Sequence, residues 1–126
     1  MSRFLTKLWL EHVDGNTWVL AAPLIYESDY LKKIVKVKAG TDTDLASVPD
    51  ILRGWFPKSG KWNPDAVLHD AGYFDKLWHN DSDILVHLTK AESDKLFHEA
   101  LLVSGIGKKL ANLFYWAVSN FGRVEK

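Results

Sequence analysis

The residues best suited to proton-transfer chemistry in this chain are His69, Tyr73 and Asp94, which carry an imidazole, a phenol and a carboxyl group. His69 and Tyr73 are four residues apart, a spacing that places both on one face of a helix. Asn63 is a favourable N-cap and Pro64 suits the first helical position, so a helix is predicted to begin there. Its stripe with the imidazole and the phenol is expected to face the core.

Asp94 belongs to a second predicted helix, which opens with the capping-box pattern of Thr89 and Glu92. The residues at i, i+3, i+4 and i+7 share one face of that helix: Asp94, Phe97, His98 and Leu101. A carboxylate on a buried stripe is costly unless it is paired. We therefore expect the two helices to pack with Asp94 accepting hydrogen bonds from His69 and Tyr73. In the alternative, water reaches Asp94 near the helix start, and His69 is a core histidine bonded to a backbone carbonyl.

The composition is that of an ordinary globular domain. With 126 residues, 47% hydrophobic and 25% charged, the chain can form one domain (1–126) around its own core. Sixteen basic and sixteen acidic residues cancel, which argues against nucleic acid as a partner. The lack of cysteine excludes disulfides and thiolate chemistry. The sequence contains no apolar run long enough for a transmembrane segment and no signal-peptide pattern, so the protein is expected to be cytosolic when made.

The N-terminal part, residues 1–40, is predicted to be β-rich. Asp14-Gly15 lies between apolar, β-prone segments and is a hairpin signal, which gives strands at about 4–13 and 17–26. Lysine alternates with aliphatic residues over 33–38, a pattern typical of an edge strand. Residues 41–62 are expected to form an ordered loop that includes a short helix opened by Pro49.

The C-terminal part, residues 63–122, is predicted to be helical. Helices are expected at about 64–78, 90–104 and 107–121, and the last of them has a clean apolar stripe. The predicted fold class is therefore α+β, with a small N-terminal antiparallel β-sheet followed by a three-helix C-terminal half.

Three spaced motifs resemble those of a family of small uncharacterised proteins of tailed bacteriophages. They are Thr-Asp-Leu-Ala-Ser-Val-Pro at 43–49, Ala-x-x-His-Asp-x-x-Tyr at 66–73 and Asp-x-x-Phe at 94–97. The resemblance spans about 37–122. It implies a phage origin, a location in the host cytoplasm or the virion, and a phage or host protein as partner.

The segment around His69 also resembles the core of the secretory phospholipases, above all the cysteine-free parvovirus capsid type. This resemblance implies that His69 is a general base that activates water, that Asp94 orients it with help from Tyr73, and that Asp70 is a calcium ligand. It also implies phospholipase-like paired helices and a lipid or cell-envelope ester as substrate. The sequence departs from those enzymes at their glycine-rich calcium loop, because residues 55–62 contain only Gly60, and calcium needs six to eight oxygen ligands.

Two other sites are conceivable from residue types. Ser47 could join His69 and Asp94 in a nucleophilic triad, although no Gly-x-Ser-x-Gly elbow surrounds it. A zinc or HD-type metal site could use His69 and Asp70 together with either His98 or His87. Such sites need a further histidine on an upstream helix, and the sequence places the upstream His12 in a hairpin.

Two classes of function follow from these observations. The first is a non-enzymatic phage protein, a virion, tail-associated or host-interacting component in which His69, Tyr73 and Asp94 form a buried polar network. The second is a phospholipase-like hydrolase that uses water activated by His69. Exposure of the second imidazole nitrogen of His69 to a pocket would separate the two.

Overall fold

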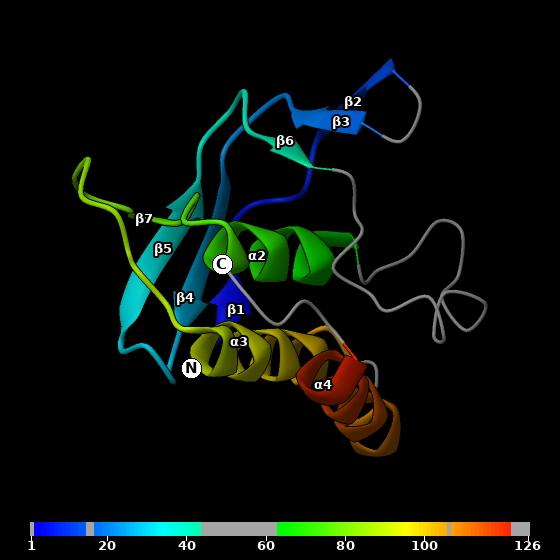
Figure 1. The fold of residues 1–126 in the computed structure, drawn as a ribbon. Coiled ribbons are helices and arrows are strands. Elements are labelled where there is room, and N and C mark those ends of the chain that lie inside the picture. The colour runs from blue at the N-terminus through cyan, green and yellow to red at the C-terminus, as the bar shows by residue number, and fades with distance from the viewer. Residues whose placement is uncertain (1, 15–16, 44–62, 106, 122–126) are drawn as a thin grey trace.

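The computed structural model describes residues 2–14, 17–43, 63–105 and 107–121, which form a β-rich N-terminal part and a helical C-terminal part (Figure 1). The strands of the N-terminal part are β1 (Arg3–Phe4), β2 (Leu10–Asp14), β3 (Thr17–Leu20), β4 (Leu24–Ser28), β5 (Lys33–Val37) and β6 (Asp42–Thr43). The elements of the C-terminal part are α2 (Asn63–Tyr73), β7 (Trp78–His79), α3 (Lys90–Val103) and α4 (Lys108–Phe121). The predicted α+β class is confirmed.

The strands form two antiparallel sheets. Sheet A has the order β1-β4-β5-β7, and sheet B has the order β2-β3-β6. In β4 alternate residues are buried, as the two-residue period of a strand with one core-facing side requires. Tyr26 of β4 pairs with Val35 of β5, and both are fully buried. Sheet A therefore supplies the β side of the core.

The predicted hairpin is present in sheet B, where Asp14 of β2 pairs with Thr17 of β3. However, the two long strands predicted at 4–13 and 17–26 are wrong, because each is interrupted and its two halves belong to different sheets. Thr6 gives one reason. Its hydroxyl accepts from the Ile25 amide at 2.9 Å and donates to the Pro23 carbonyl at 3.2 Å, so a side chain takes the place of the backbone ladder.

The strand predicted at 33–38 forms as β5, but it is not an edge strand. It lies between β4 and β7, and β7 covers only two of its residues through the pairs Val35–His79 and Lys36–Trp78. Lys38 does not prevent the pairing of β5 with β7. Its ammonium lies 3.7 Å from the centroid of the Trp78 ring and makes a cation–π contact with β7. The lysine pattern therefore marks a sparsely covered strand.

The three predicted helices are all present. α3 begins with the full capping box, in which Thr89 accepts from the Glu92 amide and Glu92 accepts from the Thr89 amide. α2 ends at Tyr73, five residues before the predicted end. Asp75 has a φ of 58° and the Lys76 amide bonds to the Ala71 carbonyl at 2.8 Å, so the chain leaves the helix in a left-handed turn. The loop and short helix predicted at 41–62 lie largely outside the described residues.

α2 and α3 pack against each other in opposite directions and cover one face of sheet A, while α4 lies on the outer side of α3 (Figure 1). The first turn of α2 meets the end of α3 at Asp65 and Ser104, and Gly72 near the end of α2 meets Ser93 in the first turns of α3. One hydrophobic core joins sheet A to α2 and α3, and a second one joins α3 to α4. α3 is therefore shared by both cores.

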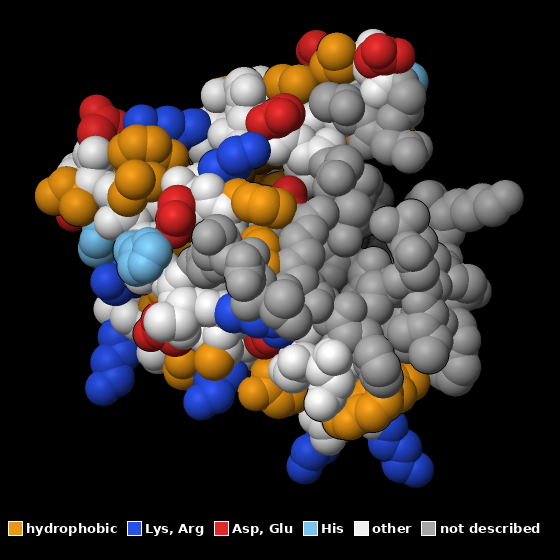
Figure 2. Space-filling model, in the orientation of Figure 1, with side chains coloured by type: hydrophobic (Ala, Val, Ile, Leu, Met, Phe, Trp, Pro, Cys, Tyr) orange, Lys and Arg blue, Asp and Glu red, His pale blue; other side chains and the backbone are white. Residues whose placement is uncertain are grey.

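The described part of the surface carries charges of both signs. In Figure 2 basic and acidic side chains are intermixed on the face shown, in keeping with the formal net charge of zero. Among the described residues, no helix combines the length and the apolar character that crossing a membrane requires.

Candidate functional site

His69 and Asp94 form a buried pair between α2 and α3. The Nε2 atom of His69 lies 2.7 Å from Oδ1 of Asp94, and the two residues are 4% and 2% exposed. His69 also lies against the ring of Phe97, with ring centroids 4.8 Å apart. The predicted hydrogen-bond contact between His69 and Asp94 is confirmed, and we call this pair the dyad.

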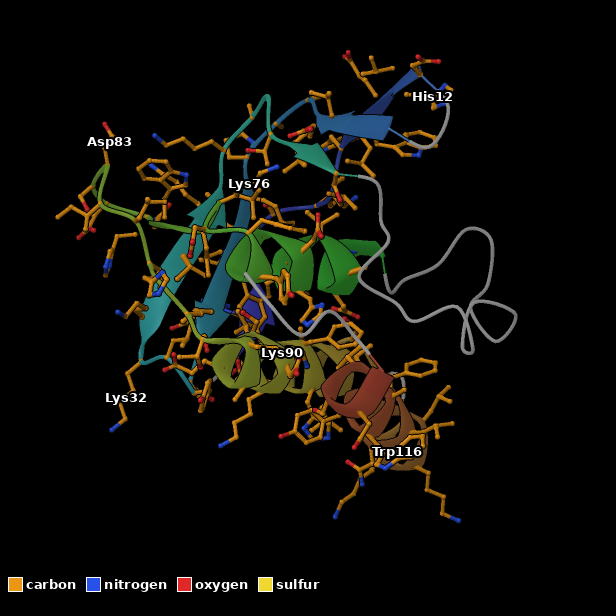
Figure 3. The ribbon with its side chains drawn as sticks, viewed as in Figure 1. His12, Lys32, Lys76, Asp83, Lys90 and Trp116 are labelled. Carbon is orange, nitrogen blue, oxygen red and sulfur yellow. The ribbon has the colours of Figure 1, made fainter. Side chains whose placement is uncertain are left out.

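The second oxygen of Asp94 is bound by a lysine. The ammonium of Lys90, which projects from the first turn of α3 (Figure 3), lies 2.8 Å from Oδ2 of Asp94. The same ammonium lies 2.9 Å from the Val118 carbonyl and 3.5 Å from the Ser119 carbonyl, both in the last turns of α4. Sequence reasoning missed this residue, although the i, i+4 spacing of Lys90 and Asp94 on one helix signals such a pair.

The contacts of Asp94 determine its ionisation. Burial acts to raise the pKa of the Asp94 carboxyl, but the hydrogen bonds from His69 and Lys90 outweigh it and hold the pKa below its ordinary value. Asp94 is therefore a carboxylate at neutral pH, and a carboxylate can only accept. Nε2 of His69 must carry the hydrogen, so in the neutral imidazole Nδ1 presents a lone pair.

That Nδ1 atom is the unusual feature of the site. It is buried, and none of the described residues forms a hydrogen bond with it. Buried polar atoms in native proteins are nearly always bonded, so one left without a partner needs an explanation, such as a catalytic role or a bound water molecule. The dyad thus has one nitrogen that Asp94 orients and one buried nitrogen that no described residue binds, and in this conformation the second nitrogen does not have the exposure expected of a catalytic imidazole.

Tyr73 is buried, as its place on the stripe of His69 predicted, and its ring lies 5.0 Å from that of Phe74. The donors described for Asp94 are His69 and Lys90. A hydrogen bond from Tyr73 to Asp94 stays a prediction. Lys90 is the donor described at Oδ2 of Asp94, the carboxylate oxygen that His69 does not contact.

Asp70 is buried and points to sheet B. Its Oδ2 atom accepts a hydrogen bond of 3.1 Å from the hydroxyl of Thr43 in β6. Within the described ranges, no three His, Asp or Glu side chains come together in a way that could hold a metal ion. Calcium requires six to eight oxygens. One carboxylate that already accepts from a threonine does not fit that requirement, and we derive no step through calcium.

The remaining histidines considered for metal binding have other contacts. Nε2 of His98 lies 2.6 Å from the side-chain oxygen of Asn112 on α4, and Nδ1 of His87 lies 2.8 Å from Asp75. Both are structural contacts between neighbouring segments. Ser47, the nucleophile of the conceivable triad, lies outside the described residues.

Another buried carboxyl group, Asp65, lies one helical turn before His69 on α2. It is fully buried, its Oδ1 accepts from the Ser104 hydroxyl at 2.8 Å, and its Oδ2 has no partner among the described residues. Burial raises its pKa to about 8, against a smaller lowering by Ser104, so the group is largely protonated at neutral pH. The burial of Asp65 was not predicted from the sequence, because carboxylates in the first turn of a helix are usually solvated.

No curated protein and no solved structure matches the chain. One family model matches residues 18–118, a range that includes α2 and α3 and reaches into the last turns of α4. His69, Asp94 and Lys90 lie inside this range. The chain therefore belongs to the DUF1353 family, described as proteins of unknown function.

Proposed function

We propose that the protein is a hydrolase of carboxylic esters in which His69 activates water. The observation that carries this proposal is the state of the imidazole: Asp94 holds Nε2 at 2.7 Å, and the buried Nδ1 has no hydrogen-bond partner in the part of the chain that the structure describes. A histidine used only as a structural link gains nothing from an unbonded nitrogen, which costs about 1–3 kcal/mol. A histidine that acts as a general base, in contrast, needs an unbonded nitrogen to accept the proton.

In the proposed reaction, Nδ1 takes a proton from a water molecule while the water oxygen attacks the ester carbonyl carbon. The bond between that carbon and the leaving oxygen then breaks. The leaving oxygen takes the proton from the imidazolium, so the products are a carboxylic acid and an alcohol, and His69 returns to its neutral form. Asp94 accepts from Nε2 throughout and stabilises the imidazolium with its negative charge.

The reaction also requires water and substrate to reach Nδ1, which is buried in this conformation. Opening of the site is therefore part of the proposal. The resemblance of the residues around His69 to secretory phospholipases supports a lipid or cell-envelope ester as the substrate. It does not extend to their calcium, for which the described residues offer one carboxylate that is already bonded to Thr43.

The test is hydrolysis of two substrates, a soluble nitrophenyl ester of a short acid and phosphatidylcholine vesicles, each with calcium and with a chelator. We expect turnover that is lost at least ~100-fold in His69→Gln, as removal of a general base predicts. His79→Gln is the matched control, because His79 is a half-buried histidine of β7, away from the dyad. Turnover that is absent from the wild type on both substrates, or equal in His69→Gln, would overturn the proposal.

A second candidate is a non-enzymatic phage component, and the contacts of Lys90 favour it. Through Lys90 and Asp94 a single buried network joins α2, α3 and α4, which is what a structural link between helices would do. The motif resemblance supports a phage origin. Under this candidate, purified virions or a phage–host complex contain the chain by mass spectrometry, and His69→Asn lowers the free energy of unfolding by about 1–3 kcal/mol without any turnover to lose.

A further inference from the structure

Lys90 makes contacts that a surface lysine does not make. Its side chain is 21% exposed, and its ammonium lies between the carboxylate of Asp94 and two main-chain carbonyls of α4, those of Val118 and Ser119. These oxygens sit near the C-terminal end of α4, where the helix dipole is negative and favours a cation. One ammonium therefore donates hydrogen bonds both to Asp94 of the dyad and to carbonyls at the end of α4.

The charge of Lys90 acts directly on the dyad. Asp94 has one oxygen on the imidazole of His69 and the other on the ammonium of Lys90, at 2.7 and 2.8 Å. Because the carboxylate is shared, it cannot give its full negative charge to the imidazole. The positive charge of Lys90 thereby opposes uptake of a proton by the dyad.

We propose that Lys90 is a positioning residue that sets the protonation of the His69–Asp94 dyad. The carbonyls of Val118 and Ser119 in α4 hold its ammonium on Asp94. The inference rests on the proposed function for its effect on catalysis, but its effect on protonation can be measured without turnover.

The distinguishing change is Lys90→Met, which keeps the unbranched side chain and removes the charge. Lys90→Arg keeps the charge and is the conservative variant. Lys109→Met makes the same chemical change at an exposed position of α4 and is the control. In Lys90→Met the dyad is expected to take up a proton at a pH about one unit higher than in the wild type, because one neighbouring cation has been removed.

The measurement is a pH titration of the ring nitrogen and carbon-bound hydrogen signals of His69 by NMR, at a temperature where every variant is folded. An upward move of the titration in Lys90→Met, its restoration in Lys90→Arg and no move in Lys109→Met support the proposal. An unchanged titration in a folded Lys90→Met overturns it, since a purely structural lysine would leave the titration in place. Lys90→Gln provides the same comparison if Lys90→Met does not fold.

The kinetic arm separates this inference from the proposed function. If the wild type hydrolyses either ester, the acid limb of its pH–rate profile is expected to move to higher pH in Lys90→Met by the same amount as the NMR titration. If the wild type hydrolyses neither ester, the hydrolase proposal fails, and the NMR result alone decides the role of Lys90. A rate loss in Lys90→Met with an unmoved acid limb contradicts the inference and leaves the hydrolase proposal standing.

Discussion

At the residue scale, Glu99 is the carboxylate that holds α3 on sheet A. Its Oε1 accepts from the hydroxyls of Tyr26 and Ser28, each at 2.8 Å, and its Oε2 accepts from the Tyr30 amide at 2.8 Å. Tyr26 is fully buried, and burial followed by the neighbouring Glu99 raises the pKa of its phenol far above the ordinary value, so it stays a donor. Glu99 is therefore a structural acceptor rather than a catalytic acid.

Glu99→Ala is expected to lower the free energy of unfolding by about 2 kcal/mol or more, because it strands two buried hydroxyl groups at once. Urea unfolding followed by tryptophan fluorescence measures the change. Glu99→Gln keeps a carbonyl acceptor and is expected to lose less, and Glu11→Ala on the exposed strand β2 is expected to stay within about 0.5 kcal/mol of the wild type. Equal stabilities of Glu99→Ala and the wild type would contradict this role.

For single residues of the site, the sequence predicted only the contacts that follow from the faces of two helices. The stripes of two predicted helices placed His69 opposite Asp94, and the structure has that contact. The spacing of Lys90 and Asp94 on one helix signals their pair, but the bonds from Lys90 to backbone carbonyls of α4 have no signature in the sequence. The unbonded Nδ1 was hidden for the same kind of reason, since whether a nitrogen finds a partner depends on every element packed around it.

At the element scale, the contact of α2 with α3 depends on Gly72. A Cβ atom at this position would lie 3.2 Å from Oγ of Ser93 and 3.2 Å from a terminal methyl of Leu88, and both neighbours are buried. The hydroxyl of Ser93 has no hydrogen-bond partner in the described ranges, so the serine serves as a small residue at the crossing of the helices. Glycine at one side and serine at the other let the helix backbones approach closely.

Gly72→Ala is expected to destabilise the protein by about 1 kcal/mol net, because overpacking of about 1–3 kcal/mol exceeds the gain of about 1 kcal/mol in helix propensity. Ser93→Ala is expected to be neutral or stabilising, since it removes a buried hydroxyl that makes no bond. The double variant is expected to recover part of the loss of Gly72→Ala. Thermal unfolding of all four proteins measures this coupling, and strict additivity would contradict the close contact.

Helices were predicted better than strands for a physical reason. The capping box at Thr89 and the apolar stripe of the last helix are local signals, and α3 and α4 begin and end within one residue of the predicted bounds. Strand pairing is non-local. The interruption near Pro23, where Thr6 replaces the ladder, and the pairing of β5 with β7 depend on segments far apart in the chain.

At the scale of the whole molecule, Asp65 links the stability of the fold to pH. The group is buried between the first turn of α2 and the end of α3, and burial raises its pKa to about 8. In the unfolded chain its pKa is near 3.8, so between these two values the folded protein holds a proton that the unfolded chain has released. Stability from this group is therefore complete below pH ~4 and is lost as pH rises toward 8.

The opposite dependence comes from carboxyl groups whose pKa is held low. Asp94 is one, with burial outweighed by His69 and Lys90, and its contribution is present above its unfolded pKa and is lost as pH falls through the lower folded pKa. The two effects occupy separate windows, because Asp94 acts only in acid below about pH 4 and Asp65 acts above it. A decline in stability between pH 5 and 8 can therefore be assigned to Asp65 by comparison with a variant.

Asp65→Asn supplies that comparison, because asparagine keeps an oxygen for the Ser104 hydroxyl and cannot ionise. We expect the free energy of unfolding of the wild type, measured in urea from pH 5 to 8, to fall relative to that of Asp65→Asn by up to ~1.4 kcal/mol per pH unit. The variant is then the more stable protein near pH 8. Asp81→Asn, a change of an exposed aspartate in the turn after β7, is expected to follow the wild type at every pH. A constant difference between wild type and Asp65→Asn across this range would mean that Asp65 is ionised in the folded protein, and that the contact of α2 with the end of α3 admits solvent.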